Sequence, residues 1–270
     1  MHFTVAGQDT YAYTGAKPFD AAKPSVVFVH GAGLDHCVWI LQSRWFAHHG
    51  YNAIAVDLPG HGRSAGTTLA DIPAMGAWVL ECMSALAVER AAVVGHSMGS
   101  LVALEAAAQA AERVAVAGLL GIAVPMPVSD PLLDAARDND HAAIDMVTLW
   151  GHGFGAQIGG NTAPGMWMTG AGMRLLERGA PGLLHNDLKA CNDYTGGLEA
   201  APKVTCPALV LLGAQDIMAS PRAIGPLMDA LPHARLKQLD PCGHMLMAEQ
   251  PDAVLDALSE AISPVLPGTS

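Results

Sequence analysis

The chain has 270 residues, with 14 basic and 25 acidic side chains, a formal net charge of −11 and a pI near 5.4. Apolar residues make up 51% and charged residues 14%, against about 25% charged in ordinary globular proteins, which excludes an intrinsically disordered chain. The acidic balance argues against a nucleic-acid partner, because phosphate binding needs basic side chains.

Short apolar runs alternate along the chain with longer helical patterns. Residues 3–16, in which Thr and Tyr alternate, predict an antiparallel hairpin at the edge of a sheet. The runs that follow are apolar throughout, as in strands covered on both faces, so they predict a doubly wound, parallel α/β sheet. The predicted strands are 26–29, 53–56, 91–94, 114–122, 208–212 and 234–239, and the predicted helices are 39–49, 73–86, 99–111, 221–231 and 251–262.

The middle of the chain breaks this alternation. Between about 126 and 204 the sequence offers helical pieces and no good strand candidate. We therefore predict a helical cap domain at 127–204, inserted into a core domain made of 1–126 and 205–270. Such a cap would lie over the C-terminal edge of the sheet, where ligands bind in open α/β folds. The alternative is that these helices extend the core, because methionine and tryptophan at helical spacing more often pack than bind.

The strongest motif is Gly-His-Ser-Met-Gly at residues 95–99, directly after one predicted strand and directly before a helix. A serine hydroxyl attacks well only when it is raised within reach of a base and when the resulting oxyanion is stabilised. Glycines two residues on either side allow the strained strand-to-helix turn that exposes Ser97. The alternative is a chance match in a chain with 29 glycines.

Two further loops follow predicted strands. At 30–35 the sequence His-Gly-Ala-Gly-Leu-Asp predicts an oxyanion hole formed by the backbone N–H groups of Ala32 and Met98, the alternative being an ordinary glycine turn. We expect a structural role for His30. At 57–64 the sequence Asp-Leu-Pro-Gly-His-Gly-Arg-Ser marks a tight turn, in which we expect Asp57 and Arg63 to brace the loop through hydrogen bonds or an ion pair.

A serine nucleophile also needs a histidine base and an acid that orients it. Asp216 follows the predicted strand 208–212, and His244 follows the strand 234–239 after a glycine, so both lie where strand ends converge. The alternatives are a helix-capping role for Asp216, Asp240 as the acid, and a structural role for His244.

These motifs together resemble those of the α/β-hydrolase superfamily over nearly the whole chain. The resemblance implies a triad of Ser97, His244 and Asp216, an eight-stranded, mostly parallel sheet and a helical cap. Ser97 separates the chain from the branches with an aspartate nucleophile, the epoxide hydrolases and haloalkane dehalogenases. The loop at 30–35 departs from the His-Gly-Gly-Gly of hormone-sensitive-lipase-like esterases and from the His-Gly-Ser-Gly-Pro-Gly typical of carbon–carbon bond hydrolases.

Other chemistry has little support in the sequence. No His cluster shows metal-ligand spacing, and no complete dinucleotide or phosphate loop is present, so we expect neither a metal nor a cofactor. The five cysteines form no CxxC pair, and residues 1–22 lack a basic region followed by an apolar stretch. We expect a cytoplasmic protein that is a monomer or homodimer and has no membrane partner.

The leading functional hypothesis is a carboxylesterase acting on a small or medium-sized, partly apolar ester through an acyl-enzyme. The same triad would serve a carbon–carbon bond hydrolase of ring-fission dienoates, a thioester or lactone hydrolase, or a perhydrolase. A slow-turnover ligand receptor is the alternative outside enzymes. The side chains that we expect to contact the substrate are Trp39, Trp150, Phe154, Met166 and Trp167.

Overall fold

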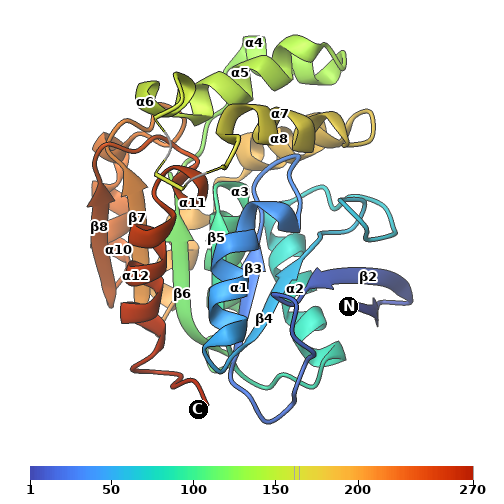
Figure 1. Cartoon of the computed structure of the whole chain (residues 1–270), viewed down its shortest axis with the longest axis vertical. Coiled ribbons are helices and arrows are strands. Elements are labelled where there is room, and N and C mark those ends of the chain that lie inside the picture. The colour runs from blue at the N-terminus through green and yellow to red at the C-terminus, as the bar shows by residue number, and fades with distance from the viewer. Residues whose placement is uncertain (161, 164, 270) are drawn as a thin grey trace.

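An eight-stranded sheet runs through the middle of the molecule in the computed structural model, which describes residues 1–160, 162–163 and 165–269 (Figure 1). The strand order is β1-β2-β4-β3-β5-β6-β7-β8, in which β1 and β2 pair antiparallel and β3 to β8 run parallel. The predicted α/β class, the edge hairpin and the eight-stranded, mostly parallel sheet are therefore confirmed. The strands are β1 (His2–Val5), β2 (Gln8–Tyr13), β3 (Ser25–Val29), β4 (Asn52–Val56), β5 (Ala91–His96), β6 (Val114–Leu120), β7 (Ala208–Gly213) and β8 (Ala234–Leu239).

Helices cover both faces of the sheet and create two hydrophobic cores. One core lies between the sheet and α2 and α3, and the other between the sheet and α1 and α12. The predicted helix 39–49 begins earlier, in a 3-10 turn, because the side chain of Asp35 accepts the backbone N–H of Cys37. These helices are η1 (His36–Trp39), α1 (Ile40–His48), α2 (Ile72–Ala85), α3 (Met98–Gln109), η3 (Pro221–Ala223), α10 (Gly225–Ala230), α11 (Leu246–Glu249) and α12 (Pro251–Ile262).

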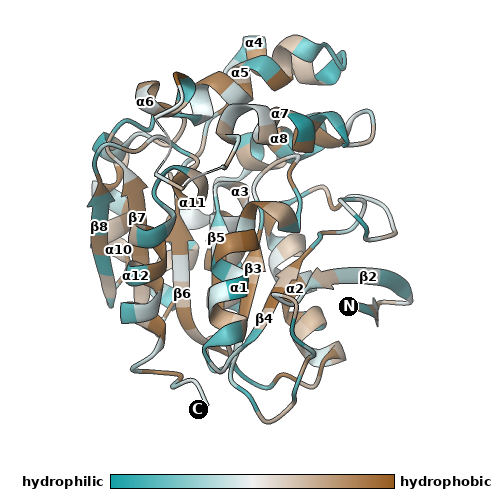
Figure 2. Cartoon of the chain, in the orientation of Figure 1, coloured by the Kyte–Doolittle hydropathy of each residue, from teal (hydrophilic) through white to brown (hydrophobic). Residues whose placement is uncertain are grey.

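The central strands are hydrophobic and the last strand is polar, as Figure 2 shows. Every residue of β3, β4, β5, β6 and β7 is buried, because helices cover both faces of these strands. The edge strand β8 instead carries exposed polar side chains, including Arg235 and Gln238. Polar edge strands resist pairing with a second sheet, so this edge discourages aggregation.

The segment between β6 and β7, residues 121–207, contains helices and no strand among its described residues. Its first helices lie across the top of the sheet in Figure 1. Leu132, Ala136, Ala143 and Leu188 form a small core of their own, whereas side chains from Ala190 onward join the main core. The division into a cap and a core domain stays a prediction. The helices are α4 (Asp130–Arg137), α5 (His141–Gly151), α6 (Phe154–Gln157), α7 (Met168–Glu177), α8 (Leu183–Asp193), α9 (Gly197–Ala200) and η2 (Ala201–Lys203).

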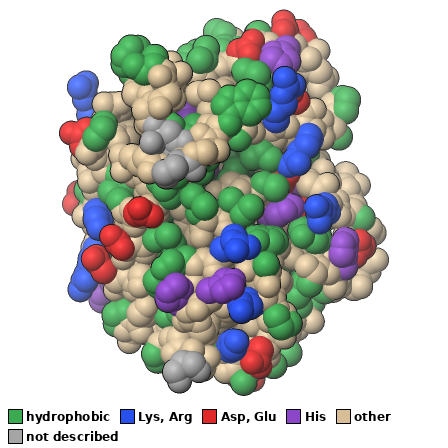
Figure 3. All heavy atoms as spheres, viewed as in Figure 1, with side chains coloured by type: hydrophobic (Ala, Val, Ile, Leu, Met, Phe, Trp, Pro, Cys, Tyr) green, Lys and Arg blue, Asp and Glu red, His purple; other side chains and the backbone are tan. Residues whose placement is uncertain are grey.

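The surface is mixed in character. On the face drawn in Figure 3, charged side chains lie singly or in small groups, with hydrophobic side chains between them. All five cysteines are free thiols, four of them buried and Cys37 half-buried. Across the described ranges, no helix is both long enough and apolar enough to traverse a bilayer.

Candidate active site

Ser97 lies in the sharp turn that joins β5 to α3. Its backbone has φ 55° and ψ −120°, a left-handed conformation that is strained for a residue with a Cβ. Added Cβ atoms would lie 1.7 Å from the Gly99 carbonyl oxygen at Gly95 and 2.3 Å from the Val29 carbonyl oxygen at Gly99. Only glycine fits at these two positions, so the motif permits the close packing that presents Ser97 at the top of the sheet.

His244 and Asp216 meet beyond the ends of β8 and β7. The Nδ1 atom of His244 lies 2.7 Å from Oδ2 of Asp216, and both side chains are buried. The other oxygen, Oδ1, accepts the backbone N–H groups of Met218 and Ala219, each at 2.8 Å. Burial raises the pKa of the Asp216 carboxyl, but His244 and these N–H groups lower it by more than burial raises it. The pKa therefore lies below its usual value. Asp216 is therefore an ionised acceptor that orients the imidazole. The rival acid, Asp240, is exposed.

Ser97 and His244 line the same cavity, whose volume is about 340 Å³. The Nε2 atom of His244 is buried and, among the described residues, has no hydrogen-bond partner, so it is free to accept a proton. No hydrogen bond joins it to the Ser97 hydroxyl in this structure; such bonds often tighten only when substrate binds. The other lining residues are Ala32, Met126, Pro127, Val128, Ser129, Leu132, Trp150, Leu188, Cys191, Ile217 and Met218.

The loop after β3 fixes the peptide that carries the Ala32 N–H. The Gly31 carbonyl accepts the Leu34 N–H at 3.2 Å and lies 2.9 Å from Nδ1 of His30. Nε2 of His30 in turn accepts the Leu58 N–H, so His30 is neutral, and burial together with His61 lowers its pKa to about 4. Because N–H and C=O of a trans peptide point in opposite directions, the Ala32 N–H points away from these donors.

Met98, the other predicted oxyanion donor, is the first residue of α3 and is fully buried. The first N–H groups of a helix have no acceptor within the helix, and they carry the positive end of its dipole. Ala32 lines the cavity, and Met98 directly follows Ser97. The two predicted donors thus belong to separate elements, the loop after β3 and the start of α3, and their role at an oxyanion stays a prediction.

His96 connects the turn at Ser97 to the loop that holds His244. Its Nε2 lies 2.8 Å from the His244 carbonyl oxygen, and the two rings are 4.8 Å apart. Burial, followed by the nearby His244, lowers the pKa of His96 to about 3. His96 is therefore neutral, and its Nε2–H donates to the carbonyl of His244.

Glu249 connects the loop that holds His244 to the helices above it. This carboxylate is buried, and its Oε2 accepts the N–H of Gly243 at 3.0 Å and the N–H of Gly153 at 3.1 Å. Nearby, the Met245 N–H donates to the Gly151 carbonyl at 2.8 Å. The junction between α5 and α6 and the His244 loop are thus held together at three hydrogen bonds.

Asp57 braces the neighbouring loops through hydrogen bonds, one of them to Arg63, as the sequence predicts. The fully buried carboxylate accepts the backbone N–H groups of His36 and Arg63 and lies 2.8 Å from Nδ1 of His36. The Arg63 guanidinium instead lies over the Tyr11 ring, 4.9 Å from its centroid. Burial lowers the pKa of His36, but the interactions with Asp57 and Cys37 together outweigh burial and raise this pKa to about 9.

This pairing predicts a pH-dependent stability. A histidine with a raised pKa stabilises the fold below its unfolded value of 6.5, and this contribution disappears as the pH rises through about 9. We expect His36→Gln to lower the melting temperature at pH 7, with a difference from wild type that shrinks towards pH 10. Thermal denaturation between pH 7 and pH 10 measures this difference in melting temperature. His233→Gln, which replaces an exposed histidine, is the control. A constant difference from pH 6 to 10 would contradict the ion pair.

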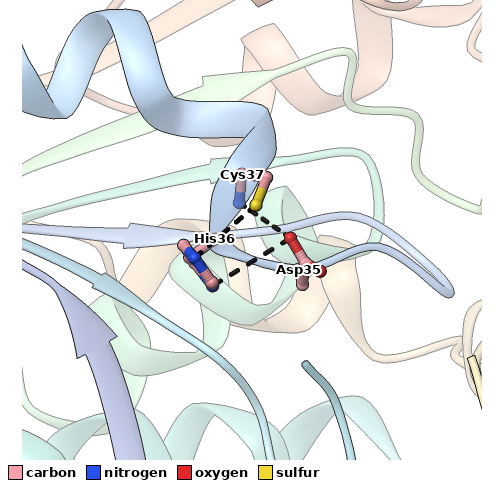
Figure 4. A group of neighbouring side chains, drawn as sticks. All are labelled: Asp35, His36 and Cys37. Atoms are coloured by element: carbon pink, nitrogen blue, oxygen red, sulfur yellow. Dashed lines mark hydrogen bonds and ion pairs between the residues drawn. The ribbon is translucent and has the colours of Figure 1, made fainter. Parts of the chain in front are cut away.

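Asp35, His36 and Cys37 are the described residues that come nearest to a metal site (Figure 4). Their candidate ligand atoms lie within 4.8 Å of one another. A metal needs a neutral imidazole and a free carboxylate, however. His36 is protonated near neutral pH, and Asp35 forms an ion pair with Arg178. The geometry fits a hydrogen-bonded brace better than a metal site.

Of the five predicted substrate contacts, only Trp150 lines the cavity. The prediction that Trp39 contacts the substrate is wrong, because its side chain is fully buried in the core against Phe28, with ring centroids 5.2 Å apart. Phe154 and Trp167 are also corrected, because their side chains are 71% and 64% exposed on the surface of the helices. Met166 is half-buried and lies outside the cavity lining. The predicted apolar character of the cavity instead comes from side chains such as Met126, Leu132, Leu188, Ile217 and Met218.

Comparison with known proteins places this geometry in a family. The model of the alpha/beta hydrolase family matches residues 26–257. Esterase YbfF of Escherichia coli K12 is 27% identical over 238 residues, which are 86% of this chain and 91% of the esterase. The solved structure of the enol-lactonase from Burkholderia xenovorans LB400 superposes with a TM-score of 0.82 at 24% identity, over 96% of this chain and 98% of that one.

A shorter match is closer in sequence. The dihydrolipoyllysine-residue acetyltransferase component of the acetoin cleaving system from Cupriavidus necator is 42% identical over 108 residues, 38% of this chain. That match spans only 26% of the acetyltransferase component. Because the family model runs from β3 into α12, the chain belongs to the alpha/beta hydrolase family.

Proposed function

We propose that the chain is a serine hydrolase that cleaves carboxylic esters of small or medium-sized, partly apolar substrates. The observation that carries the proposal is the geometry around one cavity. Ser97 lines it at the strained turn, and His244, bonded to Asp216 at 2.7 Å, lines it with a free Nε2. The similarity to esterase YbfF over most of both chains supports the same class of reaction.

The chemistry follows from these positions. The Ser97 hydroxyl attacks the ester carbonyl carbon while Nε2 of His244 takes its proton, and the N–H groups of Ala32 and Met98 stabilise the oxyanion. His244 returns the proton to the departing alcohol, which leaves an acyl group on Ser97. Water then attacks the acyl carbon, with His244 again as base, and releases the carboxylic acid. Asp216 holds the imidazole in the tautomer that can accept the proton.

The cavity lining indicates the charge of the substrate. None of its described residues is Lys or Arg, and most are apolar. A carboxylate moved from water into such a cavity loses its hydration without gaining a counter-charge, which is costly. The lining therefore favours neutral esters and disfavours substrates that carry a carboxylate into the cavity, such as ring-fission dienoates.

A screen of p-nitrophenyl esters tests this reading. We expect turnover of acetate and butyrate esters, and a kcat/KM at least about tenfold lower for the hemisuccinate ester, because its free carboxylate lacks a partner in the cavity. The neutral butyrate is the size-matched control. Equal or faster hydrolysis of the hemisuccinate would reject the proposed preference.

A neutral lactone is the second candidate substrate, favoured by the similarity in fold to an enol-lactonase. The steps are the same, except that the leaving alcohol stays tethered to the acyl group. Thioester hydrolysis, perhydrolysis and the receptor alternative have no comparable support in the cavity. Comparison of kcat/KM for butyrate esters with kcat/KM for γ- and δ-lactones distinguishes an esterase from a lactonase.

A further inference from the structure

Asp187 is a fully buried carboxylate on α8 that has no part in the chemistry proposed above. Its Oδ2 lies 2.8 Å from the backbone nitrogen of Gly33 and 2.8 Å from Nε2 of His61. Its Oδ1 accepts from the Asn186 amide at 3.2 Å. A carboxylate out of water persists only when such partners compensate its lost hydration, so this group is held in place by specific contacts.

The geometry of His61 shows that this contact is an ion pair. Nε2 faces Asp187, and Nδ1 lies 3.0 Å from the Pro59 carbonyl oxygen. Both ring nitrogens therefore face acceptors, which only the doubly protonated imidazolium can satisfy. Burial opposes the charge on His61, but Asp187 outweighs it and raises the pKa of His61; the pKa of Asp187 is lowered in turn. The neighbouring ring, His30, is neutral.

The peptide that Asp187 holds belongs to the proposed oxyanion loop. Gly33 directly follows Ala32 and has φ +68°. An added Cβ there would lie 2.9 Å from Leu184 and 3.0 Å from Leu176, so α8 and α7 pack directly on this loop. On one side of Ala32 the Gly31 carbonyl is held by Leu34 and His30, and on the other side the Gly33 N–H is held by Asp187.

We propose that Asp187 is a positioning residue that, together with the His61 imidazolium, fixes the orientation of the oxyanion loop from the helices above it. The inference rests on the proposed function, because it assigns Asp187 a task only if Ala32 is an oxyanion donor. Without the bond to Gly33, the loop is held only on the N-terminal side of Ala32, through the Gly31 carbonyl, so the position of Ala32 and the direction of its N–H are less firmly fixed. Such donors act through their fixed direction, so small rotations are costly in the transition state.

A purely structural tie is the competing explanation. Buried ion pairs contribute little net stability compared with apolar contacts of the same size, but loss of one partner is strongly destabilising. A structural tie therefore predicts a loss of melting temperature, and of activity only in proportion to unfolding. The positioning role predicts a loss of kcat in molecules that remain folded, with KM nearly unchanged.

The test uses Asp187→Ala, Asp187→Asn and, as control, Asp193→Asn, an exposed carboxylate at the end of the same helix. We expect Asp187→Ala to lower kcat for p-nitrophenyl butyrate about 100-fold at nearly constant KM. Asp187→Asn keeps an acceptor for Gly33 and restores part of this loss. The rate at which a fluorophosphonate labels Ser97 falls in the same order, and Asp193→Asn equals wild type. Melting temperatures are measured for all variants.

Three outcomes overturn the inference: kcat within threefold of wild type in folded Asp187→Ala, a change confined to KM, or Asn no better than Ala. If the alanine variant does not fold, Asp187→Asn alone decides, through a kcat and labelling rate below those of wild type. Failure of the proposed function is distinguishable, because then the fluorophosphonate does not label Ser97 in the wild-type protein.

Discussion

Replacement of Ser97 by alanine is expected to lower kcat for p-nitrophenyl acetate by about 10⁴-fold or more, to the rate that the cavity and the oxyanion donors supply without a nucleophile. Alanine carries the same Cβ as serine, so the strained backbone at φ 55° is retained at the same cost. The fold should therefore persist, and initial-rate kinetics with circular dichroism measure both effects. Fluorophosphonate labelling should disappear with the activity.

A matched control is Ser84→Ala, which removes an exposed hydroxyl near the end of α2 that does not line the cavity. This variant should hydrolyse the ester at the wild-type rate. If Ser97→Ala keeps more than a tenth of the activity of this control, Ser97 is not the nucleophile and the acyl-enzyme mechanism is wrong.

Asp216→Asn is expected to lower kcat by a similar factor, about 10⁴, although it changes one atom. Oδ1 of Asp216 accepts two backbone N–H groups at 2.8 Å, so the carbonyl oxygen of an asparagine must occupy that position. Its amide then faces Nδ1 of His244 as a donor. The imidazole is forced to carry its proton on Nε2, the atom that should accept the proton of Ser97.

The control is Asp240→Asn, since Asp240 is exposed and is the other acid that follows a strand near His244. It should remain active within twofold of wild type. Kinetics at constant pH distinguish the two variants, and melting temperatures show whether either is destabilised. A larger loss of kcat in Asp240→Asn than in Asp216→Asn would show that Asp240, not Asp216, is the acid of the triad.

The strands β3 to β7 are predictable from sequence because they are buried on both faces and therefore appear as unbroken apolar runs. Ser97 and Asp216 are found by the same logic, since each follows one of these runs, whereas His244 follows the polar edge strand β8 and is found from its place after a glycine turn. Strand and helix boundaries are less certain: β5 continues through His96, two residues beyond the predicted end, because it still pairs with β6 there.

Residues that act across long sequence separations left no comparable signal. Asp187 contacts Gly33 over 154 positions, and Glu249 contacts Gly153 over 96. A lone acidic residue in a helical pattern ordinarily indicates a solvent-exposed position. Trp39 shows the opposite failure, because its nearness in sequence to the Ala32 loop says nothing about which side of the sheet its ring packs against. His96, inside the serine motif, was the one positioning residue that the sequence could have revealed.

The two hydrogen bonds that Glu249 accepts from Gly153 and Gly243 have a consequence for substrate selectivity. The junction between α5 and α6 and the loop that holds His244 do not move independently, because the N–H groups of Gly153 and Gly243 bond to the same carboxylate. A bulky substrate that displaces the α5–α6 junction would therefore also displace His244, the base in the proposed mechanism. Substrates that are too large should therefore bind more weakly and also react more slowly once bound. We expect the upper limit on substrate size to appear as a lower kcat and not only as a higher KM.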